Sequence, residues 1–229
     1  MTSDRRDLVV TLNDEQEVAG LLQVPQHSFA CYVLAHGAGA GMIHPFLNAV
    51  AMGLAKRNIA SLRFQFPYMQ KGLKRPDPPP VAHAAVRAAV AEASRHLPNI
   101  PLIAGGRSFG GRMSSQAQAK VPLENVRGLA FLGFPLHPAG QPSQERARHL
   151  DNVDIPMLFL QGTRDSLAHL EQLEPLVRRL GSRATLKLFN DADHSFHVPA
   201  RLGKTDEDVR NELIGALADW IGMLAKSSI

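Results

Sequence analysis

Residues 101–111, which read PLIAGGRSFGG, decide the fold of this chain. Pro101–Ala104 is a short apolar run typical of a strand, and a helix is predicted from Ser108 to Ala119. Between them lies the spacing G-x-S-x-G, with Ser108 on a tight strand-to-helix turn whose neighbours must be small. The N-terminus of the helix favours negative charge that develops beside the serine. The stretch therefore predicts a nucleophilic Ser108, with a Gly-rich turn capped by this serine as the alternative.

Outward from this stretch, short apolar runs alternate with helix-like segments. Two N-terminal runs predict a hairpin turned at Asn13-Asp14, and Pro67–Pro80 is predicted as a surface loop. This alternation predicts an α/β fold, a mostly parallel central sheet with helices on both faces, in one domain over residues 1–229. The predicted strands are Leu8–Leu12, Glu17–Val24, Cys31–Ala35, Ile59–Phe66, Pro101–Ala104, Val126–Phe134, Met157–Gln161 and Ala184–Phe189; the predicted helices are Pro45–Arg57, Val81–Leu97, Ser108–Ala119, Leu170–Leu180 and Asp206–Ala225.

Two candidate partners of Ser108 also stand directly after predicted strands. Asp165 follows Met157–Gln161, and His194 follows the last strand. The carboxyl ends of parallel strands meet at one sheet edge, and the chain order Ser, Asp, His is that of a hydrolytic triad. We expect His194 to act as the base and Asp165 to orient it, although Asp165 could instead be a turn or N-cap residue.

Acidic residues beside His194 also fit a metal site. Asp191 and Asp193 precede this histidine, and His197 follows it. Apart from His197, no further histidine or cysteine stands at ligand spacing, so we expect neither a metal nor another cofactor.

Small residues after the first buried strand predict an oxyanion hole. Residues 35–41 read AHGAGAG, which lets backbone N–H groups approach a substrate closely. We expect one donor from the N–H of Phe109 and the other from Ala38 or Gly39. A phosphate-binding glycine loop is the rival interpretation, but neither of the common nucleotide-binding glycine spacings is present.

Three further residues are candidates for the pocket, each with a second role left open. His36 lies at a strand end, where it could order the loop instead. Arg107 precedes the serine and either packs or forms an ion pair, or contacts substrate. His137 either lines the pocket or fixes its own loop. The segment 135–156 is too short for a large lid, so we expect an open pocket and a substrate of modest size.

Composition excludes several classes of protein. The chain has 229 residues, 45% hydrophobic and 20% charged, with a net charge of +4 and no long basic run, so no nucleic-acid partner is expected. No apolar stretch approaches the roughly 20 residues that span a bilayer, and the charged N-terminus lacks an apolar signal region. These features predict a cytoplasmic protein that does not enter a membrane.

The only cysteine, Cys31, excludes an internal disulfide. The sequence does not decide between a monomer and a homodimer.

Four stretches carry a resemblance to a known family: 36–40, 105–111, 133–138 and 161–165. On these the chain resembles the α/β-hydrolase superfamily over nearly its whole length. More narrowly, it looks like a small bacterial branch related to the testis-expressed and nonspecific-lethal-complex hydrolase-like domains, often labelled dienelactone-hydrolase-like. Dienelactone hydrolases use a cysteine nucleophile, whereas this chain has Ser108.

The resemblance implies an α/β-hydrolase fold and leaves two function classes. The first is a serine hydrolase that cleaves a small ester substrate through an acyl-enzyme. The second is a binding or scaffold module without catalysis, the role that the resemblance to eukaryotic relatives implies.

Overall fold

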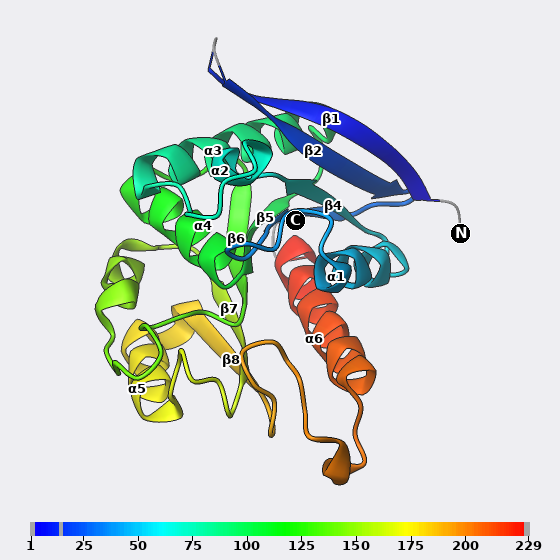
Figure 1. Ribbon diagram of the computed structural model, residues 1–229. Coiled ribbons are helices and arrows are strands. Elements are labelled where there is room, and N and C mark those ends of the chain that lie inside the picture. The colour runs from blue at the N-terminus through cyan, green and yellow to red at the C-terminus, as the bar shows by residue number, and fades with distance from the viewer. Residues whose placement is uncertain (1–2, 14–15, 227–229) are drawn as a thin grey trace.

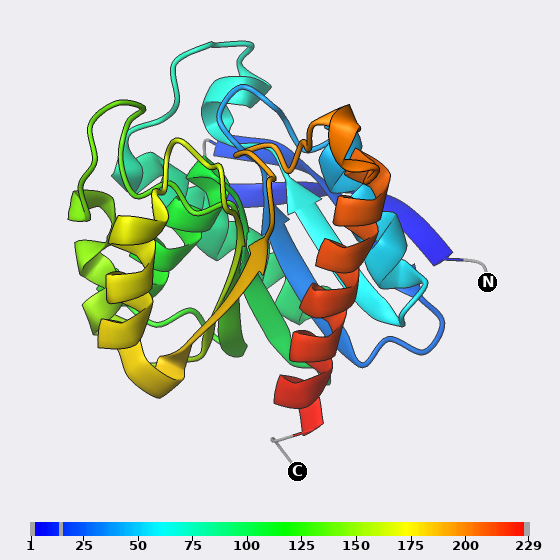
Figure 2. The same ribbon diagram turned by 90° about the horizontal axis from the view of Figure 1, so that it is seen from below.

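The computed structural model describes residues 3–13 and 16–226, and these residues form one twisted sheet between two helical layers (Figures 1 and 2). The sheet has eight strands in the order β1-β2-β4-β3-β5-β6-β7-β8 within the described residues. The first two strand pairs of this order are antiparallel and the other five are parallel, which confirms the predicted mostly parallel sheet. The strands are β1 (Ser3–Asn13), β2 (Gln16–Pro25), β3 (Ala30–Ala35), β4 (Ile59–Phe64), β5 (Leu102–Arg107), β6 (Val126–Leu132), β7 (Met157–Gly162) and β8 (Ala184–Phe189).

The helices divide between the two faces of the sheet, as Figure 2 shows. One face is covered by α3 (Pro79–His96), α4 (Phe109–Lys120) and α5 (Leu170–Leu180), and the other by α1 (Pro45–Ala55) and α6 (Asp206–Lys226). The remaining helical segments are short: α2 (Pro67–Gln70) and the 3₁₀ helices Glu145–Asn152, Gly181–Arg183 and Ala200–Leu202.

Strand β3 shows why the inner strands are continuously apolar. All six of its side chains are buried, because Cys31 and Val33 face one helical layer while Tyr32 and Leu34 face the other. The Tyr32 hydroxyl donates a hydrogen bond of 2.9 Å to the carbonyl oxygen of Ala130, so this buried polar group is satisfied.

Several predicted boundaries differ from the structure. Strand β4 ends at Phe64 instead of Phe66, because Pro67 opens the short helix α2 inside the segment predicted as a loop. Strand β6 ends at Leu132, since Gly133 has a φ of +74° and leaves the extended conformation. Strand β5 runs on through both glycines to Arg107. Asp14 of the predicted hairpin turn lies outside the described residues.

The segment between β6 and β7 holds no inserted domain. It contains the 3₁₀ helix Glu145–Asn152, which packs on α4, where Ser115 Oγ and His149 Nε2 are 2.8 Å apart. The absence of a large lid is therefore confirmed for the described chain. Within residues 3–13 and 16–226, no helix is both long enough and apolar enough to cross a membrane.

Candidate active site

Ser108 sits on a strained turn between β5 and α4. Its φ of +49° and ψ of −114° are unusual for a residue with a side chain, and such strain persists only where the surroundings impose it. Gly106, at φ +147°, lies so close to Ala35 that a Cβ there would overlap the Ala35 carbonyl oxygen. A Cβ on Gly110 would lie 2.6 Å from the same oxygen. The glycines of the G-x-S-x-G stretch are therefore required by backbone packing.

The structure brings the three predicted triad residues together. His194 Nε2 lies 2.8 Å from Ser108 Oγ, and His194 Nδ1 lies 2.7 Å from Asp165 Oδ2. The Asp165 side chain is fully buried, whereas 21% of the His194 side chain is exposed. The arrangement can move a proton from the serine to the imidazole while the carboxylate holds the ring.

Asp165 is held by residues that the sequence reasoning missed. Its Oδ1 accepts the Leu167 N–H at 2.8 Å, and its Oδ2 also accepts from the side-chain amide of Gln161. Gln161 is itself buried, and its Oε1 accepts the Phe134 N–H at 2.8 Å. A polar side chain at the end of the otherwise apolar run 157–161 was the available signal.

The loop that carries His194 is ordered by Asp193. One oxygen of this carboxylate accepts the Ser195 N–H at 2.7 Å and the His197 N–H at 3.0 Å. The His197 ring instead pairs with Asp206, at 2.9 Å. Among the described residues, no three His, Cys, Asp or Glu side chains are placed to hold a metal ion.

The two candidate oxyanion donors of the 35–41 loop differ in whether their N–H groups are already hydrogen-bonded. The Gly39 N–H donates to Tyr68 Oη at 2.9 Å, so it is not free to bind an oxyanion, and the choice of Gly39 is corrected. Within the described chain, neither the Ala38 N–H nor the Phe109 N–H meets an acceptor. Phe109 is the first residue of α4, where backbone N–H groups lack partners inside the helix. Ala38 and Phe109 are thus the remaining pair of candidate donors.

The loop is anchored from the side of α2. The backbone N–H of Tyr68 donates to Asp77 at 3.0 Å, and the Met42 N–H donates to Gln65 Oε1 at 2.8 Å. The Tyr68 ring is buried against Phe109, with ring centroids 6.5 Å apart. Side chains in and near α2 therefore position the loop that lines the same cavity as Ser108.

His36 and His137 do not line the cavity that contains Ser108, which corrects both pocket assignments. His36 is buried, its Nε2 accepts the Phe66 N–H at 3.0 Å and its Nδ1 lies 2.8 Å from the Gly37 carbonyl. Burial lowers the His36 pKa to about 4, so the ring is neutral and orders the loop. His137 is also buried, and its Nδ1 bonds the Pro138 carbonyl at 2.8 Å.

Arg107 does line this cavity, together with the serine and the histidine. The cavity has a volume of about 380 Å³. Its lining residues are Gly37, Ala38, Gly39, Ala40, His44, Arg107, Ser108, Leu167 and His194.

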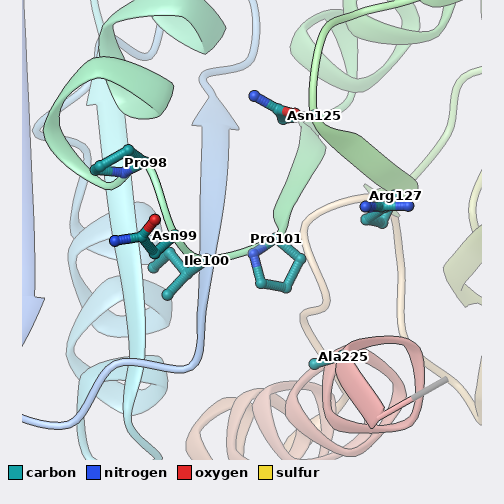
Figure 3. Close-up of a pocket in the computed structure, with 7 residues that line it drawn as sticks. All are labelled: Pro98, Asn99, Ile100, Pro101, Asn125, Arg127 and Ala225. Carbon is teal, nitrogen blue, oxygen red and sulfur yellow. The ribbon is translucent and has the colours of Figure 1, made fainter. Parts of the chain in front are cut away.

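A second hollow, of about 350 Å³, lies at the opposite end of the strands (Figure 3). It is near the first residues of β5 and β6 and is lined by Pro98, Asn99, Ile100, Pro101, Asn125, Arg127 and Ala225. This set has no acid, histidine or nucleophile, so the chemistry is concentrated at the carboxyl edge of the sheet.

Comparison with known proteins agrees with this architecture. Residues 28–222 match a family described as alpha/beta hydrolase domain. The fold is similar to that of a dienelactone hydrolase from Anabaena variabilis, with a TM-score of 0.79, 19% identity, and 96% of this chain and 98% of that chain covered. It is also similar to an α/β serine hydrolase without a lid from Xanthomonas campestris, with a TM-score of 0.74, 20% identity and 96% of each chain covered. An α/β serine hydrolase homologue from Coxiella burnetii matches with a TM-score of 0.73 and 17% identity, over 93% of this chain and 96% of that chain.

Proposed function

Because the chain belongs to the alpha/beta hydrolase family, we propose that it is a serine hydrolase that cleaves a small carboxylic ester through an acyl-enzyme. Ser108 is the proposed nucleophile, His194 the base and Asp165 the residue that orients the base. The single observation that carries the proposal is the 2.8 Å contact between Ser108 Oγ and His194 Nε2 at the wall of an open cavity.

The proposed first step forms the acyl-enzyme. Ser108 Oγ attacks the ester carbonyl carbon while its proton passes to His194 Nε2. The Nδ1–H of the ring donates to Asp165, which fixes the tautomer and stabilises the imidazolium that forms. His194 then returns the proton to the departing alcohol, and the carbonyl oxygen regains its double bond.

The negative charge on the carbonyl oxygen is met by backbone groups. The N–H groups of Phe109 and Ala38 would bind it, and the N-terminus of α4 adds a favourable partial charge. In the second step a water molecule, activated by His194, attacks the acyl-enzyme and releases the acid and free Ser108.

A binding module without catalysis is the other function class on this fold. It would be favoured by a serine separated from its histidine or by a filled cavity. Neither is observed in the described chain, where the two groups are in hydrogen-bond contact and the cavity is open. The ester hydrolase therefore has the better support.

A fluorophosphonate probe, which labels activated serines covalently, tests the proposal. The wild-type protein should be labelled and Ser108→Ala should not, while Ser94→Ala, which changes a serine on α3 away from the cavity, should be labelled like the wild type. A panel of p-nitrophenyl esters of graded chain length then measures turnover by the same three proteins. Equal labelling of Ser108→Ala and wild type, or no labelling of the wild type, would refute the proposed nucleophile.

A further inference from the structure

Arg107 presents a charged group to the same cavity as the nucleophile that follows it. Its guanidinium carbon lies 5.0 Å from the centre of the Phe46 ring, and its Nη2 donates to Ser195 Oγ at 3.0 Å. These two contacts give the guanidinium of this cavity-lining residue a defined position.

Within the described residues, no carboxylate is in ion-pair contact with this guanidinium. Among the described residues, no Asp or Glu oxygen lies within 4.0 Å of an Arg107 nitrogen. Asp193 raises the Arg107 pKa through its charge, but the main effect is burial, which lowers that pKa. One oxygen of Asp193 already accepts two backbone N–H groups of its own loop. Partial burial of a positive charge that has no ion-pair contact is unfavourable, and an anionic ligand would offset that cost.

The rest of the cavity lining adds a donor and no negative charge. None of the nine lining residues is Asp or Glu. His44 is one of them, and its Nδ1 accepts the Phe46 N–H at 3.2 Å. The proton of the neutral ring is therefore on Nε2, which is left as a second donor beside Arg107. Burial and the charge of Arg107 both lower the His44 pKa, which favours this neutral form.

We propose that the cavity binds esters that carry an anionic oxygen group, a carboxylate or a phosphate, and that Arg107 recognises this group with His44 as second donor. A planar guanidinium matches both anions because it offers paired N–H donors. This inference rests on the proposed hydrolase function, since it assigns the substrate class of the same site. In this proposal Arg107 selects the substrate, whereas in the alternative its side chain only packs on Phe46.

Two esters of equal length test the role of the charge. They are the mono-p-nitrophenyl ester of adipic acid, which has a free carboxylate, and the same compound with that carboxylate capped as a methyl ester. The ratio of kcat/KM for the anionic ester to that for the neutral ester should be at least about ten in the wild type, as for a lost charge-assisted hydrogen bond. Arg107→Met should lower this ratio by about ten-fold, and Arg107→Lys should retain part of it. Arg148→Met, which changes an exposed arginine outside the cavity, should leave the ratio unchanged.

A binding measurement separates failure of this inference from failure of the hydrolase proposal. Calorimetry with glutarate and with inorganic phosphate needs no turnover, and the tighter of the two identifies the preferred anion. Binding that is lost in Arg107→Met supports the inference even if neither ester is cleaved. A wild-type ratio near one, a ratio unchanged in Arg107→Met, or no binding of either anion to the wild type would overturn it.

Discussion

Removal of one hydroxyl group, by Tyr68→Phe, should reduce catalysis much more than stability. The Tyr68 hydroxyl accepts the Gly39 N–H at 2.9 Å and so holds the loop that contains Ala38, a candidate oxyanion donor. Phenylalanine keeps the ring and its packing against Phe109 but leaves the Gly39 N–H without its acceptor. The loop would then lose one of the contacts that hold it beside Ser108 in the cavity wall.

The expected magnitude follows from the two roles of this bond. Loss of one hydrogen bond costs about 1 kcal/mol of unfolding free energy, or about 2–4 °C in Tm for a chain of this size. Complete loss of an oxyanion donor costs about 10²–10³ in kcat. Tyr68→Phe displaces a donor without deleting it, so we expect kcat to fall about 10-fold, with KM for a small neutral ester nearly unchanged.

Tyr32→Phe is the matched control. It removes a buried tyrosine hydroxyl whose hydrogen bond is also 2.9 Å long, but this one joins β3 to β6 within the core. Both variants should lose a similar amount of Tm in thermal unfolding, and only Tyr68→Phe should lose kcat in steady-state ester hydrolysis. If the two variants keep equal kcat, or lose it equally, Tyr68 does not position the oxyanion loop.

Three further outcomes are expected. Asp165→Asn should lower kcat about 10⁴-fold, because an amide that donates to His194 selects the wrong tautomer; a loss below ten-fold in initial rates would contradict the assigned role. Gly106→Ala should destabilise the fold by about 4 kcal/mol or more in urea unfolding, since its Cβ would overlap the Ala35 carbonyl, and a wild-type midpoint would show that the turn can relax. The pKa of His36 is 6.5 in the unfolded state and about 4 in the folded state, because burial lowers it. As the pH drops from 6.5 to 4, the unfolded state therefore binds a proton that the folded state does not, and the unfolding free energy should fall by about 3 kcal/mol from this group. Urea titrations at pH 7 and pH 4 measure this loss, and His36→Gln should show a smaller one.

The positions of the three predicted triad residues could be anticipated from the sequence because each stands directly after a strand. Strands β5, β6 and β7 run parallel in that order, so Ser108 and Asp165 lie at the same edge of the sheet. His194 follows β8, which is the parallel neighbour of β7, so it lies at this edge as well. The G-x-S-x-G spacing, the chain order and the position after a strand together led to these three residues.

The contacts that support the site could not be predicted in this way. The bond from Gly39 to Tyr68 depends on α2, which formed inside a segment that the sequence indicated to be a loop. Gln161 could be noticed as a polar residue in an apolar strand, but its two partners come from β6's end and from the Asp165 loop. His36 and His137 stand at suitable strand ends, yet both side chains turn into the protein. The direction of a side chain is set by packing between segments that are remote in sequence. Neither residue spacing nor composition contains this information.

Backbone pairing sets where the Ser108 turn and the 35–41 loop leave the sheet, and side chains such as Tyr68 then fix the loop itself. Strands β3 and β5 are parallel neighbours, and their register pairs Ala35 with Gly106. Because the strands are parallel, both continue from that pair toward the same edge of the sheet, β3 to Ala38 and β5 to Ser108. Gly110 then packs its Cα against the Ala35 carbonyl, which fixes the start of α4 on the same strand end. Because these contacts are made by the backbone, a substitution in the cavity wall such as Arg107→Met can change which ligand binds without moving the two strand ends relative to each other.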